Sequence, residues 1–135
     1  MDVDKLYDYA LTLWGKPYIW GGEGPVGYDC SGFVQALLKA ARVHPPTDLT
    51  AEGLYLYYKA NGLELSSPGR GALVFFGAPR INHVGWMIDS RILISAAGGN
   101  RHCTTVEYAQ KINASVKIQP LSHYRSPVGF LLPKY

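Results

Sequence analysis

Apolar residues in the first half of the chain lie three or four positions apart, which is the spacing of an amphipathic helix. This pattern predicts three helices, over residues 4–14, 30–41 and 49–60. Asp29 is a candidate N-cap for the second helix, because a short acidic side chain can accept hydrogen bonds from the free amides of the first turn. Three polar residues are candidates to cap the third helix: Thr47, Asp48 and Thr50.

The second half of the chain changes to short, continuous apolar runs, which are typical of buried strands. These runs predict strands over 72–76, 83–88 and 92–96, with a turn at 89–91 between the last two. Because helices come first and strands afterwards, we expect an α+β fold in which the N-terminal helices pack on a central antiparallel sheet.

Two weaker strand patterns follow, over 103–108 and 126–132, while the segment 63–69 is expected to form turns and loop. The chain has 135 residues, which suits one domain over 1–135. No internal repeat, low-complexity tract or linker interrupts it.

Composition narrows the classes of function. Apolar residues make up 47% of the chain and charged residues 17%, as in a globular protein. The net charge is +3, but Lys and Arg are scattered and form no run of five, so we expect no nucleic-acid partner. There is no stretch of 18 apolar residues, so we expect no membrane span.

The first ten residues, MDVDKLYDYA, are acidic and predict a helix, so we expect no secretory signal. The protein then acts in the cytosol, is exported by a carrier, or has a leader that this sequence lacks.

The chain has two cysteines, Cys30 and Cys103. A disulfide between them is possible, but two cysteines in a chain able to form its own core do not indicate a disulfide scaffold. Zinc-binding spacings such as C-x-x-C are absent, and His102 lies too close to Cys103 in sequence to share one metal with it. We expect neither a metal nor a cofactor.

Cys30 follows a glycine-rich segment and opens the second predicted helix. At a helix N-terminus the dipole and the free amides favour the thiolate, which is the nucleophilic form, and we expect a lowered thiol pKa. The same amides can donate to an oxyanion. The alternative is an inert buried thiol, the commoner role of a lone cysteine.

A nucleophilic thiol needs a general base, and His83 is the best placed of four histidines because it opens an apolar strand that can hold its ring. A turn centred on Asp89 would place Ser95 opposite His83 on the same face of the sheet, where its hydroxyl could orient the imidazole. A two-residue turn would instead place Ala96 there and direct Ser95 to the other face.

Five segments together resemble the NlpC-type cell-wall cysteine peptidases, a papain-like group. They are Tyr18-x-Trp-Gly-Gly, Tyr28-Asp-Cys-Ser-Gly-Phe-Val, Leu73-Val-Phe-Phe, His83-Val-Gly and Ser95-Ala-x-Gly-Gly. The resemblance implies a minimal papain-like fold. It also implies hydrolysis of amide bonds in peptidoglycan stem peptides, such as the bond between D-glutamate and a diamino acid.

The resemblance also assigns roles to residues. Cys30 matches the nucleophile, His83 the base, and Tyr18 a tyrosine beside the thiol that helps the oxyanion. Asp29 and Ser31 match positions that hold the free amino end of a stem peptide in some members, although Asp29 also has the simpler role of helix cap.

The chain departs from the family pattern at three places. The third catalytic position, often His, falls on Ser95, which is a shorter and weaker orienting group. Ala72 replaces an acidic residue before the strand at 73–76, and the segment 44–50 lacks the usual Arg-Ser or Arg-Thr step. Two alternatives follow: a wall-binding or adaptor domain that has lost the chemistry, or an amidase or acyltransferase of the same fold.

Overall fold

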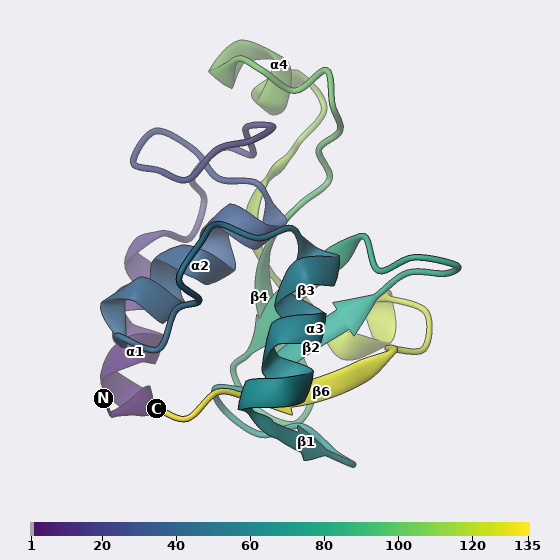
Figure 1. The fold of residues 1–135 in the computed structure, drawn as a ribbon. Coiled ribbons are helices and arrows are strands. Elements are labelled where there is room, and N and C mark those ends of the chain that lie inside the picture. Colours follow the sequence, from purple (N-terminus) through teal and green to yellow (C-terminus); the bar gives the residue numbers. More distant parts are fainter. Residues whose placement is uncertain (1) are drawn as a thin grey trace.

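The computed structural model describes residues 2–135 as helices packed on one antiparallel sheet (Figure 1). The predicted α+β class is confirmed. The helices are α1 (Val3–Thr12), α2 (Cys30–Ala40), α3 (Ala51–Asn61) and α4 (Val106–Lys111), with a short 3-10 turn η1 (Leu121–His123). The strands are β1 (Leu63–Leu65), β2 (Leu73–Phe76), β3 (His83–Met87), β4 (Ile92–Ala97), β5 (Ser115–Pro120) and β6 (Gly129–Leu132).

The three predicted helices form, and their caps explain where they begin. Asp29 accepts a hydrogen bond from the amide of Gly32 at the start of α2, as expected. Thr50, one of the three candidates, caps α3 through the amide of Gly53. Each cap satisfies an amide that the helix itself leaves without a partner.

The sheet runs in the order β1-β6-β2-β3-β4-β5, and every neighbouring pair is antiparallel. Figure 1 shows α2 and α3 against one face of the sheet and α4 at the end of the molecule far from β1. The main core lies between these helices and the sheet, and includes Phe33, Leu37, Phe75 and Trp86.

The other face of the sheet carries a smaller apolar cluster. Its fully or nearly fully buried members are Ala72, Val74, Phe76, Met87 and Leu93. Leu121 and Tyr124, in and just after η1, pack against this cluster together with Leu65 and Phe130. The segment after β5 therefore covers the second face of the sheet and brings Tyr124 over it.

Two predictions of local structure are wrong, and one strand was not predicted. The segment 63–69 was expected to be loop, but its first residues form β1, because Leu63 and Leu65 pair with Leu132 and Phe130 far along the chain. The segment 103–108 is not a strand, since Thr105 caps α4 through the amide of Tyr108. Finally, the sequence pattern missed β5, whose position depends on pairing with β4 over its whole length.

Candidate active site

The start of α2 is held by the carboxylate of Asp29. One oxygen accepts hydrogen bonds from the Gly32 amide at 2.7 Å and from the Ser31 hydroxyl at 3.2 Å, and the other accepts from the Gly21 amide at 3.1 Å. Gly32 has no room for a side chain, because a Cβ there would lie 2.0 Å from the carbonyl oxygen of Gly22. The glycine-rich segment therefore packs directly on the first turn and leaves Cys30 partly exposed beside it.

The thiol of Cys30 lies against the first residues of β3. Its sulfur donates a weak hydrogen bond to the carbonyl of Asn82 at 3.9 Å. The amide of Val84, on the other side of His83, favours the thiolate, as do the amides of Ser31 and Cys30 itself. The structure thus brings the sulfur to the backbone on both sides of His83.

The expected lowering of the Cys30 pKa is wrong for the free protein. Burial raises the pKa of the thiol to about 11, and the neighbouring Asp29 carboxylate adds to this, outweighing the three amides. Burial disfavours a charged group because the surroundings solvate it less well than water does. The resting form at neutral pH is therefore the thiol, and a base must take its proton when it reacts.

His83 has the properties of such a base. Burial lowers the pKa of its imidazole to about 4, so the ring is neutral at physiological pH and can accept a proton. A proton moving from the thiol to the ring would create two opposite charges together. Their attraction in a poorly hydrated site offsets part of the burial cost of each charge.

The His83 ring is fixed from several sides. Its Nε2 lies 3.2 Å from the hydroxyl oxygen of Ser95, which is fully buried. The ring of Tyr124 stacks on it, with centroids 5.4 Å apart and planes 18° apart, and the ring of Phe76 lies 5.8 Å away. The expected contact between His83 and Ser95 is therefore present.

The register behind that contact differs from the prediction. Trp86 pairs with Ile94 and Met87 with Leu93, which centres the turn on Ser90 and places Ser95 opposite Gly85 instead of His83. The Asp89 carboxylate sets this turn by accepting from the amides of Arg91 and Ile92. His83 and Gly85 share a face of the strand, so His83 reaches Ser95 diagonally.

Gly85 makes the diagonal contact possible. A Cβ at this position would lie 2.6 Å from Leu93 Cδ1 and 3.2 Å from Ser95 Cβ. A larger residue would therefore displace the side chains that line the path from His83 to Ser95. The glycine of the His83-Val-Gly motif thus has a steric role in the site.

Tyr18 is buried close to the thiol. Its pKa is raised by burial first and then by the negative charges that Cys30 and Asp29 would carry. Its ring packs on Gly99, where a Cβ would lie 2.0 Å from a ring carbon. Cys103 is a free buried thiol that donates to the Tyr18 carbonyl at 3.1 Å. Tyr18 is therefore held firmly next to Cys30.

Sequence reasoning missed Tyr124 and Gln119. The Tyr124 hydroxyl lies 3.3 Å from the Ser95 oxygen and donates to Gln119 Oε1 at 2.7 Å. The alternating pattern of 115–120 could have indicated β5 and placed Gln119 on one face of a strand. Nothing in the sequence indicates that Tyr124 folds back onto His83.

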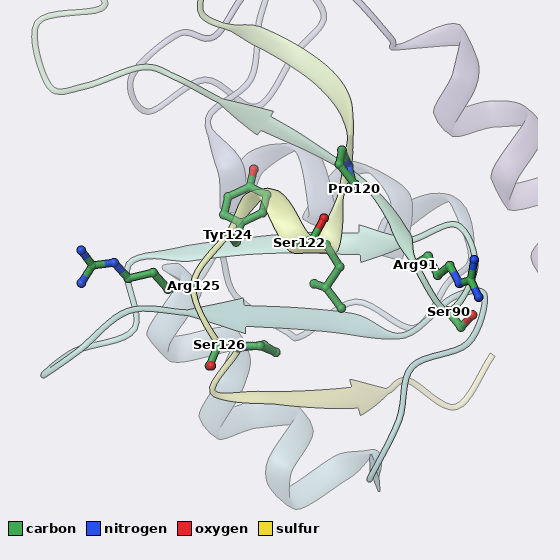
Figure 2. Close-up of a pocket in the computed structure, with 9 residues that line it drawn as sticks. Ser90, Arg91, Pro120, Ser122, Tyr124, Arg125 and Ser126 are labelled. Atoms are coloured by element: carbon green, nitrogen blue, oxygen red, sulfur yellow. The ribbon is translucent and has the colours of Figure 1, made fainter.

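Two cavities are lined in part by residues of the site. One of about 250 Å³ lies beside the start of α2, and its walls include Glu23, Asp29, Ser31 and Asp48. Another of about 530 Å³ lies behind Tyr124 and does not include Cys30 or His83 in its lining. Figure 2 shows this second cavity, with the Arg91 and Arg125 side chains extending in opposite directions. The first cavity does not include Cys30 or His83 in its lining either, but its walls contain Asp29 and Ser31, the direct sequence neighbours of Cys30.

Within residues 2–135, no group of three or more His, Cys, Asp or Glu side chains is arranged to hold a metal ion. The helices of this same part of the chain are also too short or too polar to cross a membrane.

Comparison with curated proteins finds relatives that are peptidases by name. The chain is 34% identical over 83 residues to the probable endopeptidase p60 of Listeria innocua, covering 61% of this chain and 17% of that protein. It is 36% identical over 75 residues to a gamma-D-glutamyl-L-lysine dipeptidyl-peptidase of Bacillus subtilis, covering 53% and 24%. It is 41% identical over 76 residues to the murein DD-endopeptidase MepH of Escherichia coli, covering 53% and 27%. The match thus spans about a quarter or less of each relative's length.

Solved structures share the fold over nearly the whole chain. An NlpC/P60 family protein from Bacillus cereus matches with a TM-score of 0.73 at 24% identity, covering 96% of this chain and 39% of that one. RipD from Mycobacterium tuberculosis, described as a non-catalytic NlpC/p60 domain protein adapted to peptidoglycan binding, matches with a TM-score of 0.67 at 19% identity, covering 98% and 97%. At these identities the likeness concerns the fold, which is papain-like as expected.

The family match covers most of the site described above, whereas Tyr124 lies beyond the matched residues. It extends over residues 15–119, from the glycine-rich segment to the end of β5, and includes Tyr18, Cys30, His83 and Ser95. The chain therefore belongs to the NlpC/P60 family.

Proposed function

We propose that this chain is a cysteine peptidase that hydrolyses amide bonds in peptidoglycan stem peptides, with Cys30 as nucleophile and His83 as general base. The observation that carries the proposal is the position of the Cys30 thiol, at a capped helix start and against the backbone on both sides of a neutral, hydrogen-bonded His83. Residues 1–135 would act as one catalytic domain.

In the proposed reaction, His83 takes the thiol proton as the sulfur attacks the scissile carbonyl. The charge that develops on the carbonyl oxygen is held by the backbone amide of Cys30 and the hydroxyl of Tyr18. One such donor typically contributes a factor of about 10²–10³ in rate. The imidazolium then gives its proton to the leaving amine, and water hydrolyses the thioester with His83 again as base.

Ser95 is the third member of the site in this proposal. A base acts best when a further group holds its ring, and the Ser95 hydroxyl is the group within hydrogen-bonding distance of His83 Nε2. Serine is neutral, so it orients the ring without the charge stabilisation that a carboxylate would give the imidazolium. This fits an imidazole pKa as low as about 4.

The cavity of about 250 Å³ is the proposed place for the amino end of the stem peptide. Its acidic walls favour an ammonium group through simple charge attraction. Asp29 already accepts three hydrogen bonds, so it would contribute charge more than a new hydrogen bond. The Ser31 hydroxyl donates its hydrogen to Asp29, so its oxygen remains able to accept a hydrogen bond from the ammonium group. We favour the bond between D-glutamate and the diamino acid, as in the name of the Bacillus subtilis relative.

The test is a set of defined substrates analysed by mass spectrometry. It contains a stem peptide with a free amino end, the same peptide N-acetylated, a cross-linked D-alanyl–diamino acid dimer, and a lipid amide. The proposal predicts cleavage of the free stem peptide after D-glutamate and slower cleavage of the acetylated one. Cleavage of the lipid amide alone would overturn it in favour of an amidase or acyltransferase.

A wall-binding domain without catalysis is the second candidate, because RipD shares the fold and is described as non-catalytic. The two functions separate when binding to insoluble peptidoglycan and release of new amino groups are measured on one preparation. Binding without release would favour the second candidate. Action at the bacterial cell wall belongs to the same proposal, as does delivery by a phage tail or secretion-system carrier.

A further inference from the structure

A chain of hydrogen bonds extends from His83 to the end of β5. Nε2 of His83 lies 3.2 Å from Ser95 Oγ, which lies 3.3 Å from the Tyr124 hydroxyl oxygen, which in turn lies 2.7 Å from Gln119 Oε1. The four groups come from β3, β4, β5 and the segment after η1, so the sheet pairing and the fold-back of that segment together assemble them.

The last acceptor in this chain sets the direction of every bond before it. Tyr124 has one hydroxyl hydrogen, and it donates that hydrogen to the carbonyl oxygen of Gln119. Toward Ser95 the Tyr124 oxygen can then only accept, so the Ser95 hydroxyl must donate to it. Ser95 in turn can only accept from His83, which requires a hydrogen on Nε2.

We propose that Tyr124 and Gln119 are positioning residues of the catalytic site, which act through Ser95 to hold His83 in the Nε2–H tautomer and leave Nδ1 free to take the thiol proton. This inference rests on the proposed function for its catalytic meaning. The tautomer itself is a property of the folded chain that can be measured without any substrate.

The surroundings of the hydrogen-bonded chain support a role in fixing its members. Ser95 is fully buried, so its hydroxyl needs hydrogen-bond partners within the protein, and His83 and Tyr124 lie within hydrogen-bonding distance of it. The Tyr124 ring stacks on His83 and also on Phe76, whose ring centroid lies 4.4 Å away, so the three rings form one cluster. Tyr124 therefore restrains both the plane of the imidazole, through its ring, and the proton on Nε2, through its hydroxyl.

Two pairs of variants separate these effects. Tyr124→Phe keeps the stacked ring and removes the hydroxyl, whereas Tyr124→Leu removes both. Gln119→Glu keeps an acceptor at the end of the chain, whereas Gln119→Met has nearly the same shape and no comparable acceptor. Ser122→Ala, on the exposed side of the same segment, is the control.

The first measurement is the ¹⁵N and ¹³C NMR spectrum of the His83 ring in the full chain at pH 7. We expect the parent, Gln119→Glu and Ser122→Ala to show one tautomer, with hydrogen on Nε2. Tyr124→Phe and Gln119→Met are expected to show a mixture or the opposite tautomer. A parent with hydrogen on Nδ1, or a Gln119→Met spectrum identical to that of the parent, would overturn the inference.

The second measurement is the steady-state rate on the stem peptide. We expect kcat to fall about tenfold in Tyr124→Phe and Gln119→Met with KM nearly unchanged, further in Tyr124→Leu, and to be restored in Gln119→Glu. Equal losses in Gln119→Glu and Gln119→Met would contradict a role for the acceptor. If the parent cleaves nothing but shows the expected tautomer, the proposed function fails while the assigned hydrogen-bond direction stands.

Discussion

The two halves of the candidate site are built in different ways. The half that carries Cys30 is mostly local: Asp29, Ser31 and Gly32 are neighbours in sequence, and the cap and the partly exposed thiol follow from a stretch of a few residues. The half that carries His83 is assembled from β2, β3, β4, β5 and the segment after η1, through pairings between distant parts of the chain. Changes in the first half should thus act locally, and changes in the second should spread through the sheet.

Among changes in the half of the site that carries His83, removal of the base itself should reduce catalysis most. In His83→Gln the ring is replaced by an amide that cannot take the thiol proton, and general-base catalysis is typically worth about 10²–10⁴-fold. We expect kcat/KM on the stem peptide to fall by about that factor while the thermal unfolding midpoint stays within a few degrees. His44→Gln, at an exposed histidine, is the control and should match the parent.

The pH dependence of kcat/KM should reveal the protonation of His83. Burial lowers the pKa of His83 to about 4, so the neutral, active ring persists well below the ordinary imidazole value of about 6.5. We expect the acid limb of kcat/KM near pH 4. An acid limb at or above pH 6.5 would show that the ring is not buried as described.

Folding stability should respond to this pKa in a defined direction. The unfolded chain binds a proton at His83 near pH 6.5, whereas the folded chain does so only near pH 4. The contribution of His83 to the free energy of unfolding should therefore decrease as the pH falls from 6.5 to 4. Subtracting the pH profile of His83→Gln from that of the parent, in urea unfolding, isolates this contribution.

A methyl group added at Gly85 should disturb the half of the site that carries His83 without removing any polar group. In Gly85→Ala the new methyl group meets Leu93 and Ser95, and overpacking of this kind typically costs about 1–3 kcal/mol. We expect a lower unfolding midpoint and a lower kcat together. Gly69→Ala places the same methyl group in open space and should leave both unchanged; equal effects in the two variants would refute the steric role.

The smallest effect on catalysis should come from a change at Asp29, in the half of the site that carries Cys30. Asp29→Asn keeps the oxygen that caps α2, whereas Asp29→Ala removes it and typically costs about 1 kcal/mol. If the charge also attracts the amino end of the substrate, Asp29→Asn raises KM for the free stem peptide but not for its N-acetylated form. An unchanged KM in Asp29→Asn would restrict Asp29 to capping.

The same contrast explains what the sequence could predict. Asp29 as a cap, Cys30 at a helix start and the three N-terminal helices depend on neighbouring residues, and all three predictions are confirmed. The predicted register of β3 and β4 was wrong by two residues because the Asp89 carboxylate selects the turn. Strand β1 was missed because its partner β6 is remote, whereas β5 was missed although its alternating pattern could have indicated it. Tyr124 reaches His83 only through the fold-back after η1.

The raised pKa of Cys30 was unpredictable for a related reason. A helix start indicates a lowered thiol pKa when the thiol is considered alone, but burial against β3 reverses the balance. That burial is a property of the packing between α2 and the sheet, which no short segment encodes. The chemistry of the pair therefore depends on both halves of the site at once.

The account is tested most directly by the rate at which Cys30→Ala releases new amino groups from the defined stem peptide. The variant removes one sulfur atom from the capped helix start and should leave the fold, and binding to peptidoglycan, unchanged. The account predicts release by the parent and none above background by the variant. Release by Cys30→Ala at the parent's rate would contradict it.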